Sequence, residues 1–429
     1  MLSPRSHRND IVALLDIGSS KITCVIAQRR RSHDGVGLSA IDILGFGQRR
    51  ADGVRAGMVV DLGRAELGVR GAIGDAEATA GITIEHLTVA LSSGRLSSSH
   101  FSAHTHLKAG HVRRDDLKRL AARAREYAER DGRMLVYLNR IHYTLDGATG
   151  IRDPNRMLGK RLSCQFHAVT GEPAQLSNLE SLIERCYLSV RNFVPTSFAA
   201  AAAATTPDEQ RLGVTCIDIG AGATKIAVIS DRQFIYTDTL AVGGASLTQD
   251  ISRMLAMPLA EAERIKALYG TVLYLQRNTS TNLPYWDPNS DRLVMYKALQ
   301  GEPQETTIAE LSNILYPRAR RQLELIRERL EKSGLFHRLA QSVVLTGGGS
   351  QLSGLCSLAS DVLGCTVRVG APAPLAGLAL EYQGVALSTV AGLGLIDAVP
   401  ATAVYADSVK SKVSDSYMSR MEQWLRESF

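Results

Sequence analysis

The sequence predicts an α/β protein built from two related lobes, and two observations support this prediction. Nearly the same segment occurs twice: IVALLDIGSSKITCVI at 11–26 and GVTCIDIGAGATKIAVI at 213–229. In each copy an apolar run is followed by Asp-Ile-Gly, small residues, a Lys and a second apolar run, which is typical of two strands joined by a tight turn. A third strand-like run then enters three glycines in VVLTGGGSQLSGL, at 343–355.

The two predicted hairpins have the composition of an anion site. Small turn residues leave room for backbone N–H groups to close around a phosphate. A carboxylate would be repelled by phosphate, so an Asp at the end of each first strand is predicted to hold Mg²⁺ through water. One such hairpin is common in α/β proteins, whereas two predict homologous lobes that close on one nucleotide. The candidates are Asp16, Gly18, Ser19, Ser20 and Lys21 in the first copy and Asp218, Gly220, Ala221, Gly222, Ala223, Thr224 and Lys225 in the second.

Three further groups join this candidate set. Gly347, Gly348 and Gly349 would let backbone lie flat beneath an adenosine and its α-phosphate, although a tight strand–helix turn explains the run alone equally well. Glu263 and Lys266 are three residues apart on a predicted helix and share a face. That pair would reach the ribose and the base, while an ordinary surface pair is the alternative. Gly243 and Gly244 follow the second hairpin.

Composition limits the classes of function. A chain of 429 residues predicts two or more domains, and a formal charge of +6 permits an acidic partner or a membrane surface without requiring nucleic acid. Aromatic residues, at 5%, give no support to a base-stacking surface. The six cysteines have no zinc-site spacing and indicate buried thiols in a reducing compartment. No signal-peptide pattern and no 18-residue apolar run occur, so we expect a cytosolic protein without a membrane span.

The other elements follow from periodicity, in chain order. Apolar spacing predicts the helices, and the alanine run is predicted to form a close-packed helix because Ala is the best helix former. The pattern of apolar and polar residues changes between 91 and 170. This change predicts a small α+β unit placed between two pieces of a larger fold. The expected elements are helix 61–80, a strand reaching Ser92 and Ser93, basic helix 115–130, strand 134–145, helix 175–190, a helix over 199–204, helix 258–268, an irregular polar segment 270–305, helix 306–333 and a core helix within 385–404.

The order hairpin, hairpin, strand-GGG resembles that of the actin, heat-shock chaperone and sugar-kinase superfamily, and nearly the whole chain is similar to the FtsA family of actin-like bacterial division proteins. The resemblance implies a two-lobed, ribonuclease H-like fold with an inserted subdomain IC. It also implies binding of ATP and Mg, assembly into filaments, and contacts with the C-terminal peptide of FtsZ and other division proteins. The implied subdomains are IA (8–90, 171–210 and 371–399), IC (91–170), IIA (211–246 and 306–370) and IIB (247–305, the expected FtsZ site), then a linker (400–415) and an amphipathic helix (416–429).

The last residues have a pattern of their own. In SDSYMSRMEQWLRESF large apolar side chains recur every three or four residues, which predicts an amphipathic helix lying in a membrane interface. A helix docked on the chain's own core or on a partner is the alternative. With the resemblance, this helix places the protein on the cytoplasmic face of the inner membrane at the division site. The apolar residues are Tyr417, Met418, Met421, Trp424, Leu425 and Phe429.

Two departures from the family pattern concern the nucleotide. The family's second hairpin usually reads D-x-G-G-G-T, whereas here Ala221 replaces a Gly and the hydroxyl is displaced to Thr224. The segment 194–198 offers no carboxylate or carboxamide to orient an attacking water. We therefore expect tight ATP binding with slow or no hydrolysis. The rival hypothesis is a small-molecule kinase of the same superfamily, which would have no use for an interfacial tail.

Overall fold

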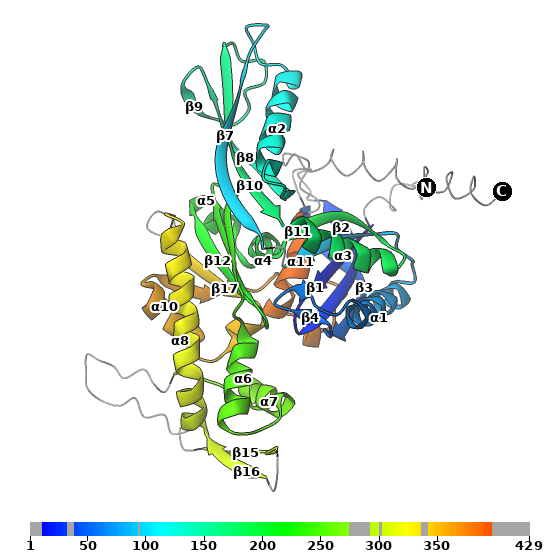
Figure 1. The fold of residues 1–429 in the computed structure, drawn as a ribbon, viewed down its shortest axis with the longest axis vertical. Helices are drawn as coiled ribbons and strands as arrows, with labels where there is room; N and C mark the ends of the chain where they lie inside the picture. The colour runs from blue at the N-terminus through cyan, green and yellow to red at the C-terminus, as the bar shows by residue number, and fades with distance from the viewer. Residues whose placement is uncertain are drawn as a thin grey trace, which may run out of the picture.

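The computed structural model describes residues 11–31, 38–92, 95–273, 292–299, 303–335 and 342–396. Two five-stranded sheets form two lobes, and a separate four-stranded sheet projects beyond the junction between them (Figure 1). The predicted two-lobed α/β fold with an inserted α+β unit is therefore confirmed. The linker 400–415 and the amphipathic helix 416–429 lie outside the described residues.

The first lobe is a mixed sheet in the order β11-β6-β1-β2-β3. The first three strands form an antiparallel meander, and β6 and β11 then add parallel to β1. Helix α1 packs on one face, where Asp61 caps its N-terminus and Gly81 ends it in the left-handed conformation. The predicted helix 61–80 is thus confirmed. Bounds are β1 Ile11–Ile17, β2 Lys21–Arg31, β3 Leu38–Arg50, α1 Leu62–Ala80, β6 His86–Leu91 and β11 Ser189–Pro195.

The second lobe repeats this topology. Its order is β14-β13-β12-β17-β18, with β12, β13 and β14 in an antiparallel meander and β17 and β18 parallel to β12. Each repeated sequence segment therefore forms the first hairpin of its own sheet, which is the relation that the doubled sequence predicts. Bounds are β12 Val214–Ile219, β13 Thr224–Ser230, β14 Gln233–Leu240, β17 Ser342–Thr346 and β18 Thr366–Val369.

The inserted unit is an antiparallel sheet in the order β7-β10-β8-β9, with helix α2 against it. Leu120 and Ala124 of α2 are buried on the sheet, as the apolar stripe predicts. The unit also contacts the second lobe: Asn139 donates to the Gln233 side chain at 2.8 Å, and buried His167 contacts the Phe234 carbonyl at 2.8 Å. Bounds are β7 Ser97–His106, α2 Arg114–Glu129, β8 Met134–Leu145, β9 Ala148–Ile151 and β10 Arg161–Gly171.

Two small-residue helices join the lobes. The alanine run forms α4, Thr196–Ala204, which packs against α11, Ser388–Ile396, between the two sheets (Figure 1). A Cβ built on Gly392 of α11 would lie 1.7 Å from the carbonyl oxygen of Ala199, so the backbones touch and only glycine fits there. The close packing predicted for the alanine run is confirmed.

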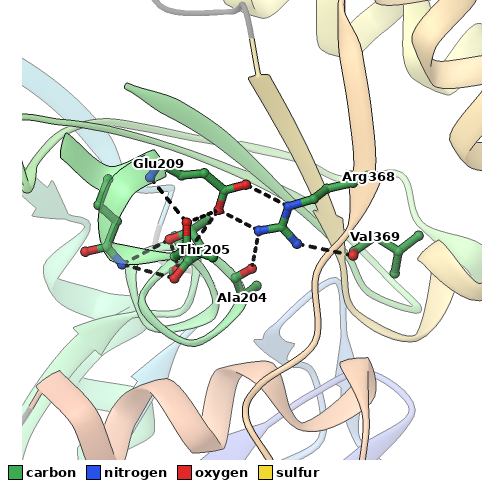
Figure 2. A network of polar contacts seen from close by, with 8 residues as sticks. Ala204, Thr205, Glu209, Arg368 and Val369 are labelled. Carbon is green, nitrogen blue, oxygen red and sulfur yellow. Dashed lines mark hydrogen bonds and ion pairs between the residues drawn. The ribbon is translucent and has the colours of Figure 1, made fainter. Parts of the chain in front are cut away.

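An ion pair fastens the segment after α4 to the second lobe. Arg368 of β18 donates to both carboxylate oxygens of Glu209, at 2.7 and 2.5 Å, and to the carbonyl of Ala204 at 3.1 Å (Figure 2). Glu209 also completes a capping box with Thr206 at the start of helix α5, Pro207–Leu212. Because Ala204 ends α4, the guanidinium lies at the negative end of that helix.

The far part of the second lobe corrects one prediction. Residues 270–305 are not irregular throughout, because β15 (Leu293–Tyr296) and β16 (Gln304–Thr307) form an antiparallel pair; 274–291 and 300–302 lie outside the described residues. The pair leads into the long helix α8, which Thr307 and Glu310 begin with a capping box. Other bounds are α6 Gly244–Met254, α7 Leu259–Tyr269, α8 Ile308–Lys332 and α10 Leu355–Leu363.

Two helix boundaries also differ from expectation. The helix predicted over 175–190 ends early, as α3, Pro173–Arg185, because Tyr187 takes a left-handed φ of 63° and the β-branched and aromatic residues that follow form β11. The helix expected at the glycine run begins only at Leu355, after a short 3₁₀ turn, η2, Gly348–Gln351. Within the described ranges, every helix is too short or too polar to span a bilayer.

Candidate functional site

The two hairpin turns have the same geometry. In the first, the amide of Gly18 donates to the carbonyl of Lys21 at 3.0 Å, and in the second the amide of Gly220 donates to the carbonyl of Ala223 at 3.0 Å. The aspartates occupy equivalent positions, each one residue before the end of its strand. A turn that closes in this way leaves the amides between the two bonded residues free to face an anion.

The hairpin turns also meet across the lobe junction. A Cβ built on Gly222 would lie 2.5 Å from the hydroxyl oxygen of Ser19 and 3.0 Å from the amide of Ala56. That hydroxyl in turn accepts a bond from the amide of Gly57 at 3.0 Å. The first hairpin, the loop at residues 56–57 and the second hairpin are therefore in direct contact, as two lobes closing on one ligand require.

Four charged residues gather where the hairpins meet. Burial raises the pKa of Asp16 to about 6, an effect that Lys225 of the other lobe opposes and Asp218 reinforces. Burial also lowers the pKa of Lys21, while Asp16 opposes that shift. The ammonium of Lys225 lies 3.2 Å from a carboxylate oxygen of Asp218. Two carboxylates and two ammonium groups thus influence one another across the junction.

The glycine run lies beside the second aspartate. Gly347 has a φ of 81°, and a Cβ there would lie 2.2 Å from the second carboxylate oxygen of Asp218, so this position requires glycine. Gly349 packs equally closely on Ile219. Gly348 is different, because a Cβ there would meet nothing within 4 Å. The run therefore presents its middle residue to open space.

The predicted Glu263–Lys266 pair lies close to both glycine segments. The Lys266 ammonium donates to Glu263 at 2.7 Å, to the Thr248 hydroxyl at 2.7 Å and to the Gly244 carbonyl at 3.1 Å. The amide of Gly244 in turn donates to the carbonyl of Gly220 at 2.9 Å. A Cβ built on Gly244 would lie 3.9 Å from the Cα of Gly349. The second hairpin, the 243–244 turn, the glycine run and α7 are thus in contact with one another, with Gly243 and Gly244 buried among them.

Comparison with known proteins agrees with this geometry. A model of the family described as cell division protein FtsA matches residues 215–392, and a model of the SHS2 domain inserted in FtsA matches residues 93–170. A cell division protein FtsA from Agrobacterium fabrum is 35% identical over 435 residues, covering 99% of this chain and 96% of that protein. The chain belongs to the FtsA family.

Solved structures support the same fold for this FtsA family member. A chain of a PilM-PilN type IV pilus biogenesis complex superimposes with a TM-score of 0.61 at 17% identity, covering 90% of this chain and 98% of that one. MreB5 of Spiroplasma citri, bound to ADP, gives a TM-score of 0.51 at 12% identity and covers 90% and 95%. At these identities the likeness concerns the fold alone, which is two actin-like lobes, while the inserted subdomain is shown by the SHS2 match.

Not every predicted residue of this FtsA family member faces the junction. Thr224 is fully buried: its hydroxyl donates to the carbonyl of Val242 at 2.7 Å and accepts from Gln322 at 2.7 Å. Thr224 therefore supports the second hairpin from inside the lobe. Ala223 is buried as well.

Three polar or backbone contributors to the junction are not among the site residues predicted from the sequence. They are the loop at Ala56 and Gly57, which have φ values of 47° and 77°, the buried Ser92, and Thr248 beneath Lys266. The two glycines of GVRAGM, Gly53 and Gly57, are the turn signals that would have indicated the loop. Ser92 and Thr248 become neighbours of the site only through the fold.

The two aspartates meet the needs of a magnesium ion unequally. Asp16 is partly accessible and provides the oxygen that hydrated Mg²⁺ prefers. Asp218 fits less well, since one of its oxygens pairs with Lys225 and the other lies against Gly347. The residues present thus fit one water-mediated contact through Asp16, while a contact through Asp218 requires Lys225 to move.

Proposed function

We propose that this FtsA family member binds ATP between its two hairpins, assembles on the cytoplasmic face of the membrane and anchors FtsZ filaments at the division site. The observation that supports this most is the direct meeting of Ser19 and Gly222, each in an Asp-Ile-Gly hairpin of its own lobe. Family membership supports the proposed cellular role, and the fold neighbour MreB5 was solved bound to ADP. Because two narrow helices join the lobes, nucleotide bound between the lobes can change the angle between them.

The nucleotide would lie along the two hairpins, the glycine run and α7. Its phosphates would be held by backbone amides of the two turns, together with Lys21 and Lys225. The adenosine would lie over Gly348, whose position is open, with Glu263 and Lys266 toward the ribose and base. Asp16 would hold a hydrated Mg²⁺, which supplies positive charge to the phosphates when it is bound.

Hydrolysis is proposed to be slow. The first turn of α4 contributes hydroxyls only: Thr196 is bonded to Ser92 at 2.9 Å, and Ser197 is bonded to Thr237 at 2.6 Å. These groups are buried and already paired, and neither is a base strong enough to orient an attacking water. ATP would then act as a conformational ligand. Steady turnover of about one per second, lost on Asp16→Ala, would contradict this proposal.

Membrane attachment is proposed to reside in the last fourteen residues, 416–429. Each of the six large apolar side chains contributes about 1.5–3 kcal/mol if fully buried, but interfacial burial is partial and ordering a short helix offsets much of it. A single tail should therefore bind reversibly. Filament formation would make attachment stable, because neighbouring tails bind together.

Liposome co-sedimentation tests the proposal. The full chain should pellet with vesicles of mixed zwitterionic and anionic lipid, more completely with ATP than without it, and Trp424→Glu should remain in the supernatant. A chain lacking 416–429 serves as the matched control, and its ATP affinity should be unchanged. Failure of the full chain to pellet in every condition would overturn the membrane role. Phosphoryl transfer to a small molecule that survives the truncation would favour the kinase alternative.

A further inference from the structure

The two hairpins differ in where their lysine stands. Lys21 follows Asp16 by five residues, whereas Lys225 follows Asp218 by seven. In strand register, Lys225 is therefore directly opposite Asp218, while the residue opposite Asp16 is the uncharged Thr23. Residues opposite one another in an antiparallel pair project to the same face, so only the second hairpin has a cation directly opposite its own aspartate, while Lys21 lies further along its strand.

The position of Lys225 is confined on several sides. Its ammonium is 3.2 Å from Asp218, and the two side chains are only 12% and 7% exposed. A Cβ built on Gly220 would lie 3.1 Å from the same ammonium, which places that group under the turn where backbone amides gather. The other oxygen of Asp218 lies against Gly347. The aspartate is thus already neutralised and enclosed before any ligand arrives.

We propose that Lys225 is the resident cation of the phosphate site, and that nucleotide therefore binds without an obligatory divalent metal. The proposal depends on the ATP site put forward above and defines its charge. In the free protein Lys225 compensates Asp218; in the complex its ammonium also donates to a β- or γ-phosphate oxygen. A magnesium ion entering beside Asp218 would meet a fixed positive charge, so the metal adds less here than in a site built from carboxylates alone.

Calorimetric titration with ATP tests this, using the full chain in excess MgCl₂ or in excess EDTA. We expect the dissociation constant of the native protein to rise less than about threefold when the metal is removed, since the cation stays in place. For Lys225→Met we expect the metal-free affinity to fall about tenfold or more, the usual effect of losing a hydrogen bond from a charged donor. Lys225→Arg should keep most of the metal-free affinity, and Lys118→Met, on the exposed face of α2, is the matched control.

Removing Lys225 alone leaves a buried carboxylate uncompensated, which endangers folding. The double variant Asp218→Asn/Lys225→Met removes both charges and should stay folded, with the same loss of metal-free affinity. A tenfold or greater loss of affinity by the native protein in EDTA would overturn the inference. So would equal metal dependence in the native protein and the double variant. Absence of ATP binding in MgCl₂ would instead contradict the proposed function.

Discussion

At the scale of single residues, neighbouring glycines at the junction have opposite roles. Gly347 has a left-handed φ and leaves no room for a Cβ beside Asp218, whereas Gly348 faces open space. The three-glycine run was readable from the sequence. Packing against the second hairpin decides which glycine is required by the backbone conformation and which leaves room for a ligand. The sequence did not reveal this division, because a run of identical residues has no internal pattern.

The pair Gly347→Ala and Gly348→Ala tests this division. Gly347→Ala should lower the free energy of unfolding by about 2–3 kcal/mol, because of the left-handed φ and the contact with Asp218. Gly348→Ala should leave stability within about 0.5 kcal/mol of the native value and weaken ATP binding only. Chemical denaturation and calorimetric titration measure the two effects. Equal stability losses in both variants would show that the open space at 348 is misassigned.

Asp16 gives the site a pH dependence whose sign follows from burial. Its pKa is about 6 in the folded chain against an ordinary value of 3.8, so between these limits the folded protein holds a proton that the unfolded chain releases. Stability contributed by this group therefore falls as pH rises from about 4 to 6 and stays low above that. At pH 7 the free energy of unfolding of Asp16→Asn should exceed that of the native protein by roughly 2–3 kcal/mol, and this difference should disappear near pH 4.

Denaturant titrations of the ligand-free protein at the two pH values measure the difference. Asp131→Asn, an exposed carboxylate 3.6 Å from Arg130, is a suitable control and should show little change at either pH. An advantage of Asp16→Asn that is equal at both pH values would mean that its carboxylate is not desolvated at the junction.

At the scale of elements, the connection between the lobes depends on small residues. Helices α4 and α11 approach so closely at Gly392 and Ala199 that backbone touches backbone. The sequence predicted the alanine helix and the last core helix, since both are strong local patterns. It did not predict β11 or the β15–β16 pair, because short strands of mixed polarity are specified by the partner that they pair with in the fold.

Gly392→Ala should destabilise the protein by about 2 kcal/mol or more, because the added methyl group forces the two helices apart. The matched change is Gly74→Ala, in the middle of α1, where a Cβ would meet nothing within 4 Å. That variant should gain about 0.5–1 kcal/mol, since Ala favours the helix. Thermal and denaturant unfolding measure both. If Gly392→Ala were neutral, the helices would not be in contact.

At the scale of the whole molecule, the two lobes share a strand order but differ in where each hairpin carries its lysine. The shared strand order explains why a repeat of sixteen or seventeen residues predicted the architecture, because the hairpin is the first unit of each sheet. Which residue lies opposite Lys225 could not be read from the sequence as easily, because the pairing of the two strands depends on the length of the turn between them. The inserted subdomain contacts the second lobe through Asn139 and His167, so movement between the lobes also bears on its position.

Recruitment of FtsZ to a supported lipid bilayer tests the central claim most directly. Fluorescent FtsZ should accumulate on the bilayer only when the full chain and ATP are both present, and the signal should be lost with Trp424→Glu or with FtsZ lacking its C-terminal peptide. Accumulation that is equally strong without this protein, without ATP or with Trp424→Glu would contradict a nucleotide-dependent membrane anchor.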